Sequence, residues 1–283
     1  LLFINRATAL RTKNAARSEA EACFSDSTVY MERFVENPRH VEIQILCDHH
    51  GNMVYLGNRD CSVQRRHQKL IEESPSAAID EETTHRMGMA ALAMARESNY
   101  KNAGTVEFIL DPSGEFYFIE VNARIQVEHS VTEMVTGVDL IQQQLLIASG
   151  EPLSIKQEDI KINGHVIECR INAEDPSKDF QPSPGKIGMF VPPGGPGIRW
   201  DSHAYSGYTV PPHYDSMIGK LLAHGPDRES ARRRMLRALD EFIVEGIKTT
   251  IPIHRRILAH SDFRTAVHDT GFVERYFGAK PSI

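Results

Sequence analysis

The stretch that decides the fold is residues 105–129, TVEFILDPSGEFYFIEVNARIQVEH. Two mainly apolar runs, residues 105–110 and 116–121, flank the segment Asp-Pro-Ser-Gly at residues 111–114. Proline favours the second position of a type I turn and glycine the fourth, so this segment is suited to reverse the chain. The stretch therefore predicts an antiparallel β-hairpin.

Acidic side chains fall on one face of this predicted hairpin. The simplest pairing sets Glu107 opposite Phe118, so Glu107 and Glu120 become diagonal neighbours, roughly 7 Å or less between Cβ atoms. If the second strand continues to residue 128, one face carries alternate residues: Glu120, Asn122, Arg124, Gln126 and Glu128. Carboxylate and amide oxygens suit Mg²⁺, so Glu107, Glu120 and Asn122 are the predicted metal ligands. An amphipathic strand with one solvated face would show the same alternation.

Other elements are expected on both sides of the hairpin. Upstream, helical composition at residues 16–21 precedes a β-like run at 29–31, strands at 40–46 and 54–56, and a basic run at 64–69. Residues 83–98 predict an amphipathic helix with methionines in the core. Downstream, Asp139 predicts the N-cap of a helix that ends at residue 147. Strands at 166–172 and 217–223 and a helix at 228–244 predict a second, α+β module after residue 164.

Composition and decoy motifs exclude several classes of protein. The net charge of −6 argues against a general nucleic-acid binder. The four cysteines have no CxxC spacing, which is typical of a reduced, cytoplasmic protein, and no apolar run is long enough for a membrane span. The proline-rich residues 191–197 predict a surface loop, not a phosphate loop. The run Arg232, Arg233 and Arg234 predicts a solvated helix face.

Five runs of sequence resemble the biotin carboxylases, which are ATP-grasp ligases. They are FIEVNARIQVEH (118–129), ENPRHVEIQ (36–44), RDCSVQRRHQK (59–69), ECRINAED (168–175) and YTVPP (208–212). The resemblance implies an α+β fold: the C-terminal part of an ATP-grasp domain, an antiparallel sheet with helices, followed by the biotin carboxylase C-terminal α+β domain. The expected divisions are residues 1–34, a remnant of the lid subdomain; 35–164, the core with the metal and bicarbonate site; and 165–283, the C-terminal domain.

The resemblance also implies a reaction. ATP phosphorylates bicarbonate to carboxyphosphate, which breaks down beside biotin, and biotin on a carrier protein is carboxylated. The catalytic residues would be Arg124, Glu128 as general base, Arg170 and Lys69. ATP would contact Glu32, Arg33, Phe34, Val35, His40, Gln64, His67 and Lys69; bicarbonate would contact Arg124, Gln126 and Val127; biotin would contact Arg170. Mg²⁺ or Mn²⁺ would complete the site. Taken alone, residues 64–69 would be a solvated basic loop and His40 a structural residue.

The chain departs from the family pattern at four places. Arg33 stands where the family often has Lys, Ala123 where it usually has Thr or Pro, and Ser130 where it usually has Pro. Residues 1–9 contain no glycine where a glycine-rich lid would end. We therefore expect weak ATP affinity and little turnover by this chain alone. The expected partners are a biotin carboxyl carrier protein, a carboxyltransferase and a second copy in a homodimer. The alternatives are another ATP-grasp carboxyl-activating ligase, or a folded inactive fragment that serves in subunit association.

Overall fold

The protein is described here by a computed structural model that covers residues 6–30 and 33–278. The chain divides into two units, Leu1–Glu36 and Asn37–Ile283, and each is described by itself. The first unit contains helix α1 (Arg6–Phe24), which includes the helix expected at residues 16–21 and is much longer. Val29 and Tyr30 are not in a strand, so the predicted β-like run is wrong there. Met31 lies outside the described residues.

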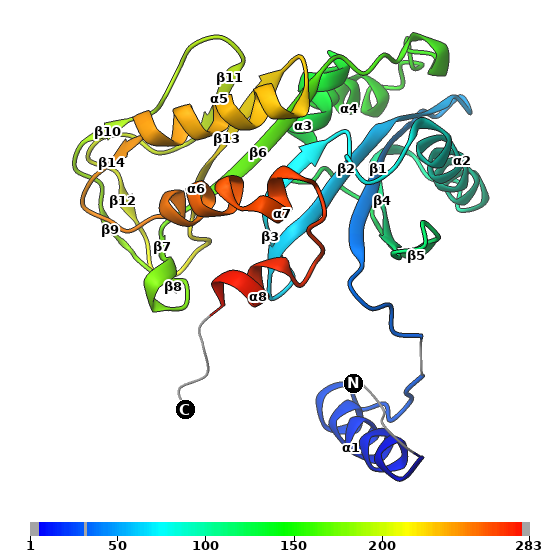
Figure 1. The fold of residues 1–283 in the computed structure, drawn as a ribbon. Helices are drawn as coiled ribbons and strands as arrows, with labels where there is room; N and C mark the ends of the chain where they lie inside the picture. The colour runs from blue at the N-terminus through cyan, green and yellow to red at the C-terminus, as the bar shows by residue number, and fades with distance from the viewer. Residues whose placement is uncertain (1–5, 31–32, 279–283) are drawn as a thin grey trace. The chain divides into compact units, whose positions relative to one another are not determined.

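The second unit is built on one antiparallel sheet of eight strands (Figure 1). Their spatial order is β11-β13-β6-β3-β2-β1-β4-β5. The bounds are β1 (Arg39–Cys47), β2 (Met53–Arg65), β3 (Gln68–Ser74), β4 (Asn102–Leu110), β5 (Phe116–Asn122), β6 (His165–Asn172), β11 (Ile198–Ser202) and β13 (Met217–Gly225). Because β3 pairs with β6, the sheet continues past residue 164. The division into residues 1–34, 35–164 and 165–283 stays a prediction.

Short strands and helices complete this unit. Three two-stranded ladders are formed by β7 (Glu174–Asp175) with β8 (Gln181–Pro182), β9 (Gly185–Lys186) with β12 (Thr209–Val210), and β10 (Phe190–Val191) with β14 (Ile243–Val244). The helices are α2 (Glu81–Glu97), α3 (His129–Thr136), α4 (Leu140–Ala148), α5 (Arg228–Glu241), α6 (Ile251–Ala259), α7 (Ser261–Arg264) and α8 (Phe272–Phe277), with 3₁₀ turns η1 (Gln157–Asp159) and η2 (Pro176–Lys178). In the described part of the chain, no helix is long and apolar enough to cross a membrane.

One face of the large sheet is apolar and covered by helices. On β1, Val41, Ile43 and Ile45 pack against Met87 and Ala91 of α2, as the predicted amphipathic helix requires. Along β6 and β13 the same role falls to α5 and α6, which lie over these strands in Figure 1. The interleaved residues of β1, His40, Glu42 and Gln44, are also buried, but they point to the opposite face. That second face is covered by α3, α4 and the residues between β5 and α3.

The predicted N-cap of α4 is confirmed, but the predicted solvated face of α5 is only partly correct. Asp139 caps α4 and accepts a hydrogen bond from the Gln142 amide, as expected. Arg232 of α5 is buried, because its guanidinium donates to the Leu258 carbonyl at 2.8 Å and pairs with Glu229. The arginine run is therefore only partly a solvated face, with Arg233 exposed.

The basic run predicted as a loop is mostly strand. β2 extends to Arg65 and β3 begins at Gln68, so only Arg66 and His67 form the turn, both with positive φ. The apolar residues that continue this hairpin, Leu70 and Ile71, anchor β3 in the core.

Two details of the decisive hairpin also differ from expectation. Phe108, not Glu107, lies opposite Phe118, and a bulge follows, so that Glu107 lies directly opposite Glu120. The bulge adds one residue to β5. Without it, the shift in pairing would place Glu107 and Glu120 on opposite faces of the sheet. In addition, β5 ends at Asn122 and α3 begins at His129, so the alternation expected up to residue 128 is wrong. The chain instead turns onto the polar face of the sheet.

Candidate active site

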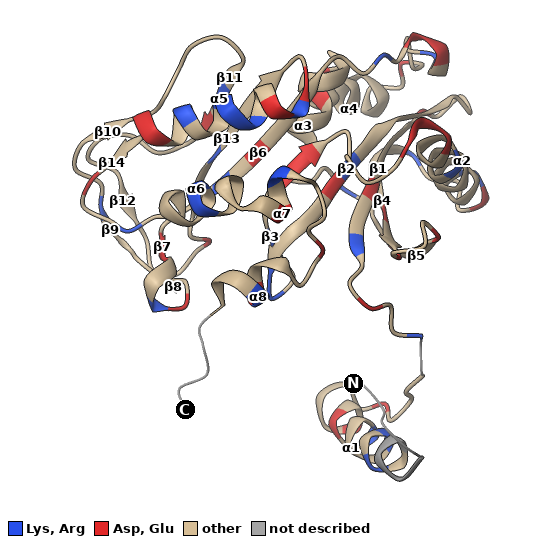
Figure 2. Cartoon of the chain, viewed as in Figure 1, with Lys and Arg blue, Asp and Glu red and all other residues tan. Residues whose placement is uncertain are grey.

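The register of four strands sets charged residues side by side on the polar face. Arg59 of β2 lies opposite Glu42 of β1, Glu42 lies opposite Glu107 of β4, and Glu107 lies opposite Glu120 of β5. Charged residues of both signs lie on the strands of the large sheet (Figure 2). Like charges directly opposite each other destabilise a sheet. This row of three carboxylates therefore needs cations and hydrogen-bond donors around it.

Arg59 supplies charge and donors at one end of the row. Its guanidinium is fully buried and bonds Glu42 through Nε at 2.6 Å. The other nitrogens donate to side-chain oxygens at 2.6–3.1 Å, on Gln44, Thr132, Thr105 and Gln126. Burial alone would raise the pKa of Glu42, but Arg59 and Lys69 outweigh it and hold the pKa at about 2. Glu42 is therefore a buried anion at neutral pH.

Lys69 of β3 lies among three carboxylates. Its Nζ is 2.7 Å from Glu42, 3.2 Å from Glu107 and 2.5 Å from Glu128. Burial would lower the pKa of Lys69, but the surrounding acidic groups raise it instead. Lys69 is thus a fixed positive charge and joins the carboxylate row to Glu128.

Glu107 and Glu120 offer oxygen ligands to a cation. Glu107 accepts hydrogen bonds from Gln126 at 2.9 Å and Asn122 at 3.0 Å, and it lies 2.9 Å from His40 Nε2. Asn122 also donates to Glu120 at 3.3 Å, so the three predicted metal ligands converge. Two carboxylates and a side-chain amide on adjacent strands fit a hard cation such as Mg²⁺. His40, Glu42 and Glu107 also bring ligand atoms within 4.8 Å of one another, but Glu42 is already paired with Arg59 and Lys69.

Glu128 connects this row to β3 and β6 in the interior of the sheet. It is 2% exposed and lies between Lys69 and Arg170, whose Nη2 is 3.0 Å away. Arg170 is held in turn by Glu72, at 2.5 Å from Nε. Glu168, opposite Glu72 on β6, accepts a 2.6 Å hydrogen bond from Ser130. Burial raises the pKa of Glu168 to about 8 despite Lys220 nearby.

Other predicted contact residues lie either outside this cluster or within it with their polar groups already bonded. Arg124 is exposed and donates to the Ile125 carbonyl, and His67 is exposed at the β2–β3 turn. Gln126 is buried, but its amide is used by Glu107 and Arg59. Gln64 is buried on β2 opposite Lys69, and Val127 is half-buried and bonded through its carbonyl to Lys220.

The predicted nucleotide hinge belongs to the other unit of the chain. Arg33 and Phe34 are exposed and Val35 is half-buried, all within Leu1–Glu36. Glu32 lies outside the described residues. The nucleotide contacts of these four residues therefore stay predictions.

Three residues of the cluster were missed by the sequence reasoning: Glu42, Arg59 and Glu72. Glu42 had a signal, because it alternates with apolar residues in a buried strand between His40 and Gln44. Arg59 lies in the family-like run 59–69, but nothing local marks its role, and Glu72 lies in no such run, since each derives its role from a partner on another strand.

Comparison with known proteins agrees with this architecture. Residues 3–156 match the family described as carbamoyl-phosphate synthase L chain, ATP binding domain, and residues 168–275 match the biotin carboxylase C-terminal domain. The chain is 57% identical over 262 residues to the biotin carboxylase of Haemophilus influenzae, covering 93% of this chain and 58% of that protein.

Solved structures show the same likeness. The biotin carboxylase domain of a thermophilic 2-oxoglutarate carboxylase bound to bicarbonate superposes with a TM-score of 0.93 at 46% identity, over 96% of this chain and 61% of that one. A dimer of the corresponding domain from Hydrogenobacter thermophilus, in complex with MgADP, ADP and bicarbonate, gives 0.90 at 45% identity, over 98% and 62%.

The antiparallel sheet with its carboxylate row, followed by the second matched domain, defines an ATP-grasp-type domain joined to a carboxylase-specific C-terminal domain. The chain belongs to the biotin carboxylase family. It spans somewhat less than two thirds of the length of these relatives.

Proposed function

We propose that this chain forms the metal, bicarbonate and biotin side of a biotin carboxylase. The reaction is the first half-reaction of an acyl-CoA carboxylase: ATP phosphorylates bicarbonate, and the carboxyphosphate breaks down to carbon dioxide and phosphate beside N1′ of biotin. The observation that supports it best is Glu128, a buried carboxylate held between Lys69 and Arg170. A base between two cations suits the capture and deprotonation of a small anion.

Each part of the cluster has a role in this proposal. Glu107, Glu120 and Asn122 would hold Mg²⁺ or Mn²⁺, which supplies charge neutralisation to the ATP phosphates. Lys69 would add a fixed positive charge beside the transferred phosphoryl group. Bicarbonate would contact Arg124, Gln126 and Val127, and Gln126 would also keep Glu107 in place through its hydrogen bond.

Proton transfer and biotin binding fall to Glu128 and Arg170. The Glu128 carboxylate would take the proton of bicarbonate while a bicarbonate oxygen attacks the γ-phosphorus of ATP and ADP leaves. The phosphate released from carboxyphosphate would then take the proton of N1′, the Arg170 guanidinium would stabilise the resulting enolate of biotin, and N1′ would attack carbon dioxide. Since Arg170 already contacts Glu128, the two steps share one pair of residues.

Phosphate release from ATP tests this proposal. We expect cleavage that depends on bicarbonate and rises with free biotin, at the low rate that the sequence predicts for this chain alone. Glu128→Gln should lose roughly a hundredfold in rate, since a positioned base contributes that order, and Arg170→Met should lose the response to biotin. Lys186→Met is the matched control, because Lys186 is exposed on β9. If biotin does not change the rate of ATP cleavage in the parent chain or in Arg170→Met, the result would favour another carboxyl-activating ligase.

Metal binding can be measured without turnover. Binding of Mn²⁺ should reduce the electron paramagnetic resonance signal of the free ion. Glu107→Gln should weaken this binding about tenfold, because one charged ligand is lost. Glu158→Gln, at an exposed glutamate, is the control. Metal binding together with no ATP cleavage would favour the folded inactive fragment.

The remaining expectations concern the partner proteins and the cellular location. A carrier protein and a carboxyltransferase follow from the proposed reaction, and the Hydrogenobacter domain dimer supports a homodimer. A cytoplasmic location stays an expectation from the cysteine pattern.

A further inference from the structure

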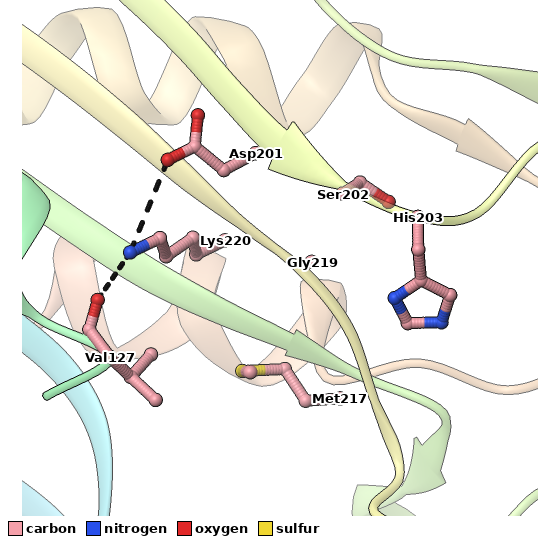
Figure 3. Close-up of a pocket in the computed structure, with 7 residues that line it drawn as sticks. All are labelled: Val127, Asp201, Ser202, His203, Met217, Gly219 and Lys220. Carbon is pink, nitrogen blue, oxygen red and sulfur yellow. Dashed lines mark hydrogen bonds and ion pairs between the residues drawn. The ribbon is translucent and has the colours of Figure 1, made fainter. Parts of the chain in front are cut away.

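The loop between β5 and α3 is held by a residue from a distant strand. Lys220 lies on β13, and its Nζ donates a hydrogen bond to the carbonyl oxygen of Val127, the residue before Glu128. Figure 3 shows the Lys220 side chain reaching between Val127 and Asp201. Lys220 is 8% exposed, and its distance to Asp201 is 4.0 Å. The bond therefore joins residues 93 positions apart across the polar face.

The surroundings make a buried ammonium costly at this position. Lys220 lies directly opposite Arg170 on β6, so two cations face each other across adjacent strands. Arg170 is neutralised by Glu72 and Glu128, whereas Lys220 has the more distant Asp201, at 4.0 Å, and the nearby Glu168, whose pKa burial raises to about 8. Charged groups are rarely buried without a close partner. The Val127 carbonyl is thus the main group that satisfies this ammonium.

The bond fixes more than one oxygen atom. A trans peptide group is planar, so holding the Val127 carbonyl also sets the direction of the Glu128 amide and the start of its side chain. On the other side of Glu128, the Ser130 hydroxyl donates to Glu168 of β6 at 2.6 Å. Strands β13 and β6 therefore anchor the loop both before and after Glu128.

Packing does not supply this restraint by itself. A hollow of about 250 Å³ lies beside the contact and is lined by Val127 and Lys220 together with Asp201, Ser202, His203, Met217 and Gly219 (Figure 3). Since side chains do not fill this space, the Val127 backbone has room to shift if the hydrogen bond is lost. Lys220 is then the group that holds the Val127 carbonyl, while Gln126 and Glu128 are held through their side chains.

We propose that Lys220 is a positioning residue that holds the Val127–Glu128 peptide so that Glu128 faces Lys69 and Arg170. The inference rests on the proposed role of Glu128 as the bicarbonate base. Lys220 acts through the backbone, and it touches neither the phosphates nor biotin in this assignment.

Hydrogen exchange of the full chain tests the positioning. In Lys220→Met, the amides of residues 124–131 should exchange about tenfold faster, since a hydrogen bond from a charged donor contributes at least that factor, while those of β1 and β6 stay unchanged. Lys220→Arg should retain most protection, because a guanidinium can also donate to a carbonyl. Lys186→Met is the control. If Lys220→Met does not fold, the same measurement is made on Lys220→Gln, in which the charged donor becomes a neutral one.

Turnover provides an independent second readout. In bicarbonate-dependent ATP cleavage, Lys220→Met should raise the KM for bicarbonate about tenfold and change the KM for ATP less than twofold. Unchanged exchange at residues 124–131, or faster exchange throughout the sheet, would overturn the positioning role. Absence of ATP cleavage in the parent chain would favour the folded inactive fragment over the proposed function, and the exchange experiment still decides the role of Lys220.

Discussion

At the residue scale, the ion pair of Arg59 and Glu42 is the most deeply buried one of the described residues. Both side chains are 0% exposed, and Arg59 also donates to residues from β1, β4, α3 and the loop before it. A buried ion pair need not add net stability, but removal of one partner leaves an uncompensated charge. Arg59 therefore determines whether the carboxylate row can stay buried.

Substitution of Arg59 should be severely destabilising. Arg59→Met leaves Glu42 with only Lys69 as a cationic partner, so the free energy of unfolding should fall by about 3–5 kcal/mol in urea titrations. Arg233→Met, at an exposed position of α5, should change it by less than about 0.5 kcal/mol. The double variant with Glu42→Gln should lose less than the sum of the two single changes. Additive losses would contradict the pairing.

Glu168 should give the protein a pH-dependent stability. Burial raises its pKa from 4.5 to about 8. Between about pH 5 and 8 the folded state therefore retains a proton that the unfolded state releases, so the free energy of unfolding falls as pH rises. Glu168→Gln should flatten this fall in urea titrations across that range. Exposed Glu158→Gln should leave it unchanged, and an equally steep fall in Glu168→Gln would refute the assignment.

Among the elements, α2 shows how one helix separates core from surface. Its N-cap Asp80 accepts a hydrogen bond from the Thr83 amide, and Met87 packs fully buried against β1 and β2. Two positions later, Met89 is 49% exposed. The periodicity of 3.6 residues predicts this difference.

These two methionines form a matched pair for experiment. Met87→Ala should lower the free energy of unfolding by about 2–5 kcal/mol, because it leaves a cavity in the core. Met89→Ala should stay within about 0.5 kcal/mol of the parent chain. Chemical denaturation of the two variants side by side measures both. Similar losses would show that α2 does not pack through the Met87 face.

The whole second unit is tied together by the pairing of β3 with β6. Ile71 lies opposite Cys169 and Glu72 opposite Glu168, so strands from both family domains form one hydrogen-bonded sheet. The site follows the same plan, since Glu128 comes from one matched domain and Arg170 from the other. We therefore expect Asn37–Ile283 to unfold cooperatively.

Hydrogen exchange can detect this cooperativity. Ile171→Ala removes a fully buried side chain of β6 and should cost about 2–5 kcal/mol. The opening free energy of the β1 amides should fall by the same amount, although β1 lies three strands away in the sheet. Ile243→Ala, at a residue 41% exposed, is the control. Unchanged β1 amides would indicate two independently unfolding parts.

The sequence by itself determined the hairpin of β4 and β5, the helices α2, α4 and α5, and the three converging residues Glu107, Glu120 and Asn122. These features depend on local periodicity, turn chemistry and a register that repeats every two residues. Only the tertiary structure decided the bulge that sets Glu107 opposite Glu120, the end of β5 at Asn122, and the partners Arg59, Glu72 and Lys220. The reason is physical: the energy of a buried charge depends on groups that are distant in sequence, and no local pattern specifies which strand supplies them.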